Sequence, residues 1–336
     1  MTSKLKQSYS FKTNAAQTFK LYISKTTNQI ESELAKLSLS LAKLNLHPQI
    51  EYAILSEGKR LRPLLAILSA ESVGGNGNKV MSLALAFELM HTATLVHDDI
   101  IDQDETRRGK PALHKKWSVN DAILTGDALI ALAVDLASSY GETVLKTVAQ
   151  SALELCDGER MDIAFSLKTM NEASYFKKIK EKSASLFAAA TYCGALVGGG
   201  TREEVRSLSV FGENFGVAYQ LKDDLLDLMR KENVVSKDLK SGRITLPLIH
   251  FYNHSSSEER KQVENMLETL INSNGTVDNE NAENILQSLH SAGSIDYCEK
   301  KIDEHLRQAV ESISTLKDTE YKAYLIEMTR ALKKWG

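Results

Sequence analysis

Hydrophobic residues recur at spacings of three and four through most of this chain, which is the pattern of amphipathic helices. Segments with this spacing predict helices over residues 50–55, 80–96, 122–136, 184–196 and 210–228. Alternation of β-branched and polar residues, the pattern of a half-buried strand, is nearly absent. Only four prolines occur among 336 residues, so little interrupts the helices. The sequence therefore predicts an all-α fold.

Short polar or glycine-rich runs between these segments predict loops. They fall at residues 74–78, 107–111, 198–200, 253–257 and 272–275. No shift in composition marks a domain boundary, so we expect one domain over residues 1–336. Residues from about 255 to 336 are more polar, with Lys and Glu at helical spacing, and are expected to form an outer helical layer.

The most apolar segment, residues 80–96, includes Glu88 and leads directly into acidic residues. Because it is short and polar for a bilayer span, we expect a buried core helix and no stable membrane insertion.

The first thirty residues lack Asp and Glu, which leaves two interpretations. They form either a transit peptide or a first helix with four apolar residues facing inward, namely Phe11, Phe19, Leu21 and Ile23.

Composition narrows the classes of function. Hydrophobic residues make up 43% of the chain and charged residues 25%, as in ordinary soluble proteins. A net charge of −3 provides no basic field, so no nucleic-acid partner is expected. The three cysteines lie far apart without CxxC spacing, which disfavours a zinc site or a disulfide framework and predicts a cytoplasmic protein.

One acidic motif, Asp-Asp-x-x-Asp, occurs twice, at residues 98–102 and 223–227. Residues four apart share one face of a helix, so the first and last aspartates of each motif point the same way. Each motif follows an apolar run, and carboxylates at the end of a buried segment need a counter-charge. Six aspartates are therefore predicted metal ligands: Asp98, Asp99, Asp102, Asp223, Asp224 and Asp227.

A hard divalent cation suits these carboxylates. Mg²⁺ takes oxygen ligands and usually binds one or two carboxylates together with substrate phosphates. Two facing acidic helices are expected to share Mg²⁺ with a bound diphosphate. The alternative is a pair of solvated acidic helix ends, which would explain one motif more easily than two.

Cations and an amide accompany the acidic motifs. Residues 58–63 (Gly-Lys-Arg-Leu-Arg-Pro) precede an apolar helix, and residues 107–111 (Arg-Arg-Gly-Lys-Pro) follow the first motif. Lys182 precedes small hydroxyl residues, and Gln220 lies just before the second motif. Arg and Lys bind phosphate oxygens, so the joint pattern suits two diphosphates, although each cluster alone is typical of a solvated surface.

These residues together resemble the trans-isoprenyl diphosphate synthase family, also called polyprenyl synthetases. The resemblance covers about residues 50–250 and rests on residues 58–63, 91–102, 107–112, 126–127, 182–187, 216–227 and 238–247. Residues 95–109 look especially like archaeal members that make geranylgeranyl or longer-chain diphosphates. The resemblance implies helices around a deep central cavity, a homodimer, and condensation of isopentenyl diphosphate with an allylic diphosphate.

Family roles carry over onto matching positions. The resemblance implies about three Mg²⁺ ions held by the aspartates, with Asp98, Asp99, Asp102, Lys182, Asp223 and Asp227 as the catalytic set. It implies that the allylic diphosphate is bound by Arg107, Lys182, Gln220 and Lys237. It implies that isopentenyl diphosphate is bound by Lys59, Arg62, His91 and Arg108; taken alone, His91 is more typical of a core histidine.

The chain departs from the family pattern in one segment. Family members usually have a Gly-Lys about ten residues beyond the second motif, then a gap, then Asp-Leu. Here Asp238 follows Lys237 immediately, which puts the role of Lys237 in doubt. Arg243 replaces a later family lysine and keeps its charge without its shape.

The product tail is expected to run along the helix that precedes the first motif. In relatives the residue five before that motif helps set the length of the product, and here it is the small Ala93. Thr94, Met90 and Phe87 are further candidates for the channel wall. A small Ala93 favours a product of C20 or longer, geranylgeranyl diphosphate or a somewhat longer chain, unless Ala93 only packs against a neighbouring helix.

Two other functions share some of these features. A class I terpene cyclase also uses an acidic motif with Mg²⁺, but its second motif usually mixes Asn, Ser and Glu, and it lacks the Gly-Lys-Arg-x-x-Arg segment. A non-catalytic subunit of a heteromeric synthase typically loses one acidic motif. Both motifs and the basic segment are intact in this chain.

Overall fold

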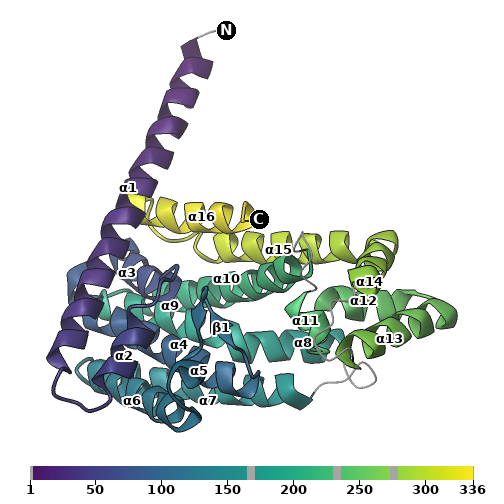
Figure 1. Ribbon diagram of the computed structural model, residues 1–336. Coiled ribbons are helices and arrows are strands. Elements are labelled where there is room, and N and C mark those ends of the chain that lie inside the picture. The colour runs from purple at the N-terminus through teal and green to yellow at the C-terminus, as the bar shows by residue number, and fades with distance from the viewer. Residues whose placement is uncertain (1–2, 165–170, 230–235, 273–278, 336) are drawn as a thin grey trace. The chain divides into compact units, whose positions relative to one another are not determined.

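The computed structural model of the chain describes residues 3–164, 171–229, 236–272 and 279–335. Helices make up nearly all of it (Figure 1). They are α1 (Ser3–Ser40), α2 (His47–Ile54), α3 (Leu61–Ser72), α4 (Met81–Ile101), α5 (Leu113–Lys116), α6 (Val119–Ser138), α7 (Glu142–Ala164), α8 (Glu172–Ile179), α9 (Ser185–Val197), α10 (Arg202–Leu228), α11 (Lys237–Lys240), α12 (Leu246–His254), α13 (Ser257–Asn272), α14 (Asn279–Ser291), α15 (Ser294–Ser312) and α16 (Glu320–Lys333). A 3₁₀ turn (Gly77–Val80) precedes α4, and a π-helical turn (Lys180–Ala184) precedes α9. The predicted all-α fold is confirmed.

All five segments predicted from hydrophobic spacing are helical, as α2, α4, α6, α9 and α10. The prediction placed the start of α10 too late, because its first turns are polar and show no hydrophobic period. Glu203 and Glu204 in the first turn favour a helix N-terminus electrostatically. At the start of α6, the Ser118 hydroxyl accepts a hydrogen bond from the Asp121 N–H, which caps the helix.

The predicted basic turn is a small hairpin. Strands β1 (Thr106–Arg107) and β2 (Lys110–Pro111) pair antiparallel, with Arg107 opposite Lys110. This ladder is the only β structure within the part of the chain that the structure describes. Arg108 and Gly109 between the strands have φ of 53° and 75°, so the hairpin needs a left-handed backbone at both positions.

Contacts divide the chain into two compact units. Unit 1 comprises Met1–Ala152, Ala189–Ser209 and Thr315–Glu327, and unit 2 comprises Leu153–Ala188, Val210–Ser314 and Met328–Gly336. The expectation of one domain over residues 1–336, with an outer layer from about 255, stays a prediction.

The core of unit 1 is built around α4, which packs against α6 along most of its length and against α3. The segment Gly77–Ile101 is long and apolar enough to cross a membrane, yet 72% of its most apolar window is buried inside the protein. This burial agrees with the predicted core helix. Small residues allow the close approach of helices here: a side chain at Gly194 of α9 would place its Cβ 2.1 Å from the Ala66 carbonyl oxygen of α3.

The first helix differs in one respect from its sequence-based prediction. Leu21 was expected to face inward, but it is 71% exposed. The core side of α1 carries Ile30 and Leu34, which are fully buried in unit 1.

Phe19 and Ile23 stand one turn apart and are half-buried, and the centre of the Phe19 ring lies 5.8 Å from that of Tyr324, so the inward prediction holds in part for these two residues. It is wrong for Leu21, because this residue is two positions from each of them and therefore lies on the opposite side of the helix. Phe11 lies outside the residues whose side chains are described.

The core of unit 2 combines an aromatic cluster with a layer of short helices. Phe187, Phe211, Phe215 and Tyr219 contact one another ring to ring. In the second group, α12 packs against α15, α14 and α8, and α13 packs against α14 (Figure 1). Unit 2 thereby contains α8, the π-helical turn and the C-terminal part of α10.

Candidate active site

The first acidic motif ends α4 in unit 1. Asp102 follows the last residue of the helix, and its N–H donates to the Asp98 carbonyl oxygen at 2.8 Å. Asp98 and Asp102 therefore lie one turn apart, as their spacing predicted. Asp99 points to a different face of the helix and is only 3% exposed.

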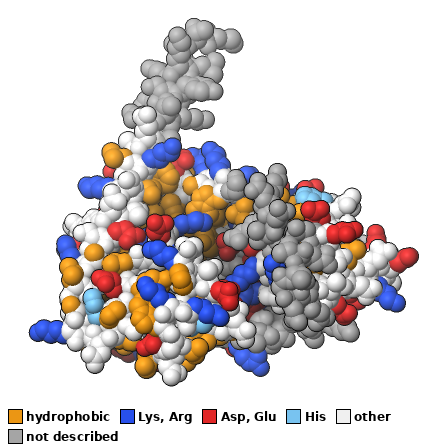
Figure 2. Space-filling model, viewed as in Figure 1, with side chains coloured by type: hydrophobic (Ala, Val, Ile, Leu, Met, Phe, Trp, Pro, Cys, Tyr) orange, Lys and Arg blue, Asp and Glu red, His pale blue; other side chains and the backbone are white. Residues whose placement is uncertain are grey.

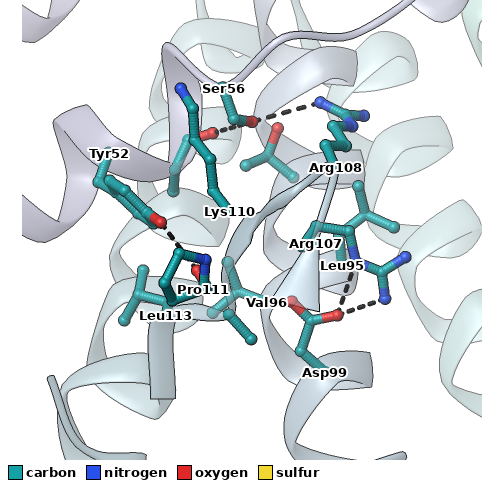
Figure 3. Close-up of a pocket in the computed structure, with 13 residues that line it drawn as sticks. Tyr52, Ser56, Leu95, Val96, Asp99, Arg107, Arg108, Lys110, Pro111 and Leu113 are labelled. Carbon is teal, nitrogen blue, oxygen red and sulfur yellow. Dashed lines mark hydrogen bonds and ion pairs between the residues drawn. The ribbon is translucent and has the colours of Figure 1, made fainter. Parts of the chain in front are cut away.

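The buried Asp99 is paired with Arg107 of the hairpin (Figure 3). The Arg107 Nε donates to Asp99 Oδ1 at 2.7 Å, and the Nη2 donates to the same oxygen. The Nη2 also donates to Asp104 Oδ2 at 3.0 Å. Although burial disfavours the charge of Arg107, these two carboxylates raise its pKa above the ordinary value. The structure thus uses Asp99 to hold Arg107, and its expected role as a metal ligand stays a prediction.

A pocket lies beside this ion pair (Figure 3). Its walls come from α2, the hairpin, and the α4 face that carries Leu95, Val96 and Asp99. Arg108 stands at its upper edge in the view, where Nη1 contacts the Ser56 hydroxyl at 3.3 Å. A Cβ added at Gly58 would lie 2.7 Å from Arg108 Nη1, so a side chain there would displace this guanidinium.

The basic segment 58–63 contains one exposed lysine, Lys59, and two buried arginines, Arg60 and Arg62. Arg60 adopts a left-handed backbone with φ of 47° and is buried. Its guanidinium is 2.6 Å from Glu88 and 2.7 Å from Glu31, and it also donates to the Ser56 carbonyl oxygen at 2.6 Å. Sequence reasoning counted Arg60 only as one more cation. Its actual contacts fix the loop that carries Lys59 and leads into α3, where Arg62 is the second residue.

His91 lies in a strongly cationic environment. Burial lowers its pKa well below the usual range, and the charges of Arg62 and Arg108 lower it further. The imidazole is therefore neutral at physiological pH. The structure brings His91, Arg62 and Arg108 together, and Arg108 also reaches the loop of Lys59, as the expected isopentenyl diphosphate site requires.

The four candidate chain-length residues lie on two faces of α4. Phe87, Met90 and Ala93 are buried, whereas Thr94 is half-buried and donates to the His91 carbonyl oxygen at 2.8 Å. Ala93 is one turn before His97, whose imidazole lies directly over Gly126 of α6. Ala93 therefore faces α6, which favours the packing alternative, and Thr94 lies one turn before Asp98.

The second acidic motif lies at the end of α10 in unit 2 and repeats the arrangement of the first. Its middle residue, Asp224, is buried and accepts hydrogen bonds at 2.6 Å from the Tyr175 hydroxyl and the Gln220 amide. The Gln220 carbonyl oxygen accepts from the Ser183 hydroxyl at 2.6 Å. The side-chain amide of Gln220 thus joins Asp224 to the turn that carries Lys182, and its expected contact with diphosphate stays a prediction.

The last aspartate of the motif anchors the segment in which the chain departs from the family pattern. Asp227 Oδ2 accepts from the Ser236 hydroxyl at 2.7 Å and from the Asp238 N–H at 3.0 Å. These bonds fix the start of α11, where Lys237 is the first residue. Asp238 lies near Asp224 and Asp227, so burial first, and then their charges, raise its pKa to about 7.

Lys182 lies in the π-helical turn Lys180–Ala184, and π-helical turns are frequent at functional sites. Its ammonium is 2.5 Å from Glu159 and 2.7 Å from Asp162, both of α7. Lys178 of α8 is 2.7 Å from the other oxygen of Asp162. Sequence reasoning missed these partners. The available signal was that Glu159 and Asp162 share one helix face, as Lys178 and Lys182 do, but spacing could not reveal that the two faces meet.

The carboxylates suit a cation that also binds substrate. Within the described ranges, no three Asp, Glu, His or Cys side chains gather closely enough to hold a metal ion by themselves. The outer aspartates of each motif offer carboxylate oxygens, and a cation bound there would share them with water or phosphate. Mg²⁺ commonly does so, which makes the donor set consistent with a magnesium diphosphate site.

Comparison with known proteins gives a consistent result. A family model described as polyprenyl synthetase matches residues 44–285. The chain is 34% identical to a short chain isoprenyl diphosphate synthase of Methanothermobacter thermautotrophicus over 82% of this chain and 86% of that protein. It is 32% identical to an octaprenyl diphosphate synthase of Escherichia coli over 83% of this chain and 86% of that protein.

Solved structures agree with the sequence matches. The geranylgeranyl pyrophosphate synthetase of Pyrococcus horikoshii superposes with a TM-score of 0.87 at 29% identity, covering 96% of this chain and 99% of that one. A polyprenyl synthase of Caulobacter crescentus complexed with calcium and isoprenyl diphosphate superposes with a TM-score of 0.82 at 26% identity, covering 93% and 97%.

The raised pKa of Asp238 predicts a pH-dependent stability. A carboxyl group whose pKa is raised by folding keeps its proton more tightly in the folded state. Its contribution to the free energy of unfolding is therefore largest below its ordinary pKa of 3.8 and is lost as the pH rises toward 7. Asp238→Asn should flatten the pH dependence of this free energy between pH 4 and 7 by up to about 1.4 kcal/mol per pH unit.

Urea unfolding in the presence of a metal chelator measures this dependence. Asp296→Asn, at an exposed aspartate of α15, is the matched control and should leave the slope unchanged. Equal slopes for the wild type and the Asp238→Asn protein would show that Asp238 titrates normally.

Proposed function

Because the chain belongs to the polyprenyl synthetase family, it is a polyprenyl diphosphate synthase, and we propose that it builds products of C20 or longer. It would join isopentenyl diphosphate head to tail, in trans configuration, to an allylic diphosphate and release diphosphate. One observation carries the proposal: both acidic motifs stand at helix ends, and the buried middle aspartate of each holds a group expected to bind diphosphate.

The two substrates would be held by different residues. Asp98, Asp102, Asp223 and Asp227, with about three Mg²⁺ ions, would bind the allylic diphosphate together with Arg107, Lys182, Gln220 and Lys237. Lys59, Arg62, His91 and Arg108 would bind isopentenyl diphosphate. The calcium and isoprenyl diphosphate in the Caulobacter relative support a divalent cation here.

The chemistry needs charge at one end of the site and dry apolar walls at the other. Divalent cations bound with the diphosphate would neutralise the charge that develops as the allylic C–O bond breaks. Arg107, fixed by Asp99, would add a preorganised cation, and the neutral His91 would offer a hydrogen bond without another charge. The apolar face of α4 would exclude water from the allylic carbocation until isopentenyl diphosphate attacks. The double bond of isopentenyl diphosphate would form the new C–C bond, and the departing diphosphate would take up the proton that the resulting carbocation loses.

The proposal also includes the length of the product. Relatives include short chain, geranylgeranyl, octaprenyl and nonaprenyl diphosphate synthases. We favour geranylgeranyl diphosphate or a somewhat longer chain, because Thr94, one turn before Asp98, is small and the larger candidates Met90 and Phe87 lie deeper along α4. The small Ala93 is consistent with this length, although it faces α6.

We also propose that the protein is a homodimer that pairs through α6. Four large apolar residues on this helix are exposed: Val119, Ile123, Leu124 and Val134. Hydrophobic side chains also reach the visible surface over α2, α5 and α6 in Figure 2. Apolar strips of this kind mark protein interfaces more often than free surface, and a second copy provides a matching strip.

Removal of one carboxylate from either acidic motif should lower the catalytic efficiency strongly. We expect Asp98→Asn and Asp223→Asn each to lower kcat/KM by at least about 100-fold, because each removes a charge that binds the metal of the leaving group. Product formation from isopentenyl and allylic diphosphates with Mg²⁺, followed by mass spectrometry, is the measurement. Asp296→Asn is the control.

Omission of isopentenyl diphosphate separates this function from a terpene cyclase. A synthase leaves the allylic diphosphate unconsumed under that condition, whereas a cyclase converts it. Full activity of both motif variants would rule out the proposed chemistry.

Larger side chains on α4 should shorten the product. Thr94→Phe fills space one turn before Asp98, and Ala93→Phe fills space at the neighbouring position, so each should shorten the main product by at least one C5 unit. Chromatography of products grown from C5, C10, C15 and C20 primers is the measurement. An unchanged product with a lower Tm for Ala93→Phe would mean that Ala93 only packs against α6.

Charge on the exposed strip of α6 should dissociate the dimer. Ile123→Glu combined with Leu124→Glu would bury two unpaired carboxylates at the interface, so analytical ultracentrifugation at micromolar concentration should show monomers. Val210→Glu, at an exposed apolar residue of α10, should leave the dimer intact. A monomeric wild type would refute the dimer and leave the proposed reaction untouched.

A further inference from the structure

Lys178 is a buried lysine for which the proposed reaction has no use. It is only 6% exposed, although an ammonium group is costly to remove from water. Its Nζ lies 2.7 Å from Asp162 Oδ1 and 5.2 Å from the centre of the Tyr175 ring. The direct contact with Asp162 compensates for much of the lost hydration, and the nearby carboxylate of Asp224 also interacts with the charge of Lys178.

The partner of Lys178 is shared with Lys182, the expected diphosphate ligand. Asp162 Oδ1 binds Lys178 at 2.7 Å and Oδ2 binds Lys182 at 2.7 Å, so one carboxylate bridges two ammonium groups. Lys182 also contacts Glu159 at 2.5 Å. Arg243 Nε lies farther from Asp162, at 3.7 Å.

The backbone keeps these groups close together. An added Cβ at Gly158 of α7 would lie 2.3 Å from the backbone nitrogen of Lys182, so only glycine allows α7 to approach the π-helical turn this closely. Asp162 is one turn beyond Gly158 on the same face of α7. The bridge from Lys178 through Asp162 to Lys182 is therefore built into the packing of α7, α8 and the π-helical turn.

Charge balance decides what Lys178 contributes. Lys182 alone would face two carboxylates, Glu159 and Asp162, and would be held tightly by them. Lys178 takes one oxygen of Asp162 and part of its negative charge, which weakens the attraction on Lys182. A lysine with a weaker internal attraction exchanges its carboxylate partner for an incoming anion at a smaller cost.

We propose that Lys178 is a positioning residue for diphosphate binding. It orients Asp162 and offsets its charge, so that Lys182 points correctly and is able to turn to the diphosphate of the allylic substrate. The inference rests on the proposed function, because it takes Lys182 as a diphosphate ligand. Lys178 itself does not touch the substrate.

Removal of the Lys178 charge should weaken the binding of diphosphate. Isothermal titration calorimetry of the full-length protein with inorganic diphosphate in excess Mg²⁺ should show a Kd about tenfold higher for Lys178→Met than for the wild type, the effect of one charge-assisted hydrogen bond. Lys178→Arg keeps the cation and should recover most of the affinity. Lys177→Met, at a lysine of the same helix whose side chain is 60% exposed, is the matched control and should bind as the wild type does.

Kinetics and a double variant test whether Lys178 acts through Lys182. The KM for the allylic diphosphate should rise about tenfold in Lys178→Met, while the KM for isopentenyl diphosphate stays within about twofold. In a Lys182→Met background, Lys178→Met should change the Kd for diphosphate by less than about twofold. If Lys178→Met does not give a cooperative thermal transition, Lys178→Gln, which can still donate to Asp162, replaces it in every measurement.

The possible outcomes distinguish the proposed role of Lys178 from the proposed synthase reaction. A wild-type Kd in Lys178→Met, or a full tenfold effect that persists without Lys182, would overturn the role of Lys178 alone. Failure of the wild type to bind diphosphate with Mg²⁺, or to consume isopentenyl diphosphate, would overturn the proposed function first.

Discussion

The neutralisation of buried carboxylates is the constraint on which this protein depends. Two acidic motifs place adjacent aspartates at the ends of apolar helices, where water cannot fully solvate them. The middle aspartate of each motif is buried and paired inside the protein, Asp99 with Arg107 and Asp224 with Tyr175 and Gln220. The outer aspartates of each motif share a different face of their helix. Each motif therefore divides its charge between an internal partner and the face expected to bind metal.

The same constraint gives several cations a double purpose. Arg107 satisfies Asp99 and Asp104, and it is also expected to bind diphosphate. Lys182 pairs with Glu159 and Asp162, and it too is expected to bind diphosphate. Arg60 differs, because its guanidinium is fully engaged with Glu31, Glu88 and backbone carbonyl groups and only shapes the loop. A cation in an acidic pocket can thus bind substrate only if its internal partners hold it loosely enough.

Rigid packing keeps these charges in place. In unit 1, α4 and α6 lie close together because small residues such as Gly126 meet side chains of the other helix without collision. In unit 2, Gly158 allows α7 to approach the backbone of Lys182. Close packing of helices leaves little freedom to relax, so the positions of Asp99, Lys182 and Asp224 are set by the helices that carry them.

The sequence by itself determined the helical fold, the two acidic motifs and the family. Hydrophobic period gives helices directly, and residues four apart share a face in any helix, so the relation of Asp98 to Asp102 followed from spacing. Leu21 of α1 was wrongly expected to face inward, because an apolar residue alone does not show which side of a helix is buried. The start of α10 was placed too late, because its polar first turns carry no hydrophobic period.

Only the tertiary structure decided which charges meet. Asp162 with Lys178, Arg60 with Glu88, and Asp99 with Arg107 are pairs between elements that the chain brings together by packing. Spacing along one helix fixes the direction of a side chain relative to its neighbours, but its partner depends on which other helix packs there. The strength of an ion pair also depends on burial, which is a property of the folded molecule and not of the local sequence.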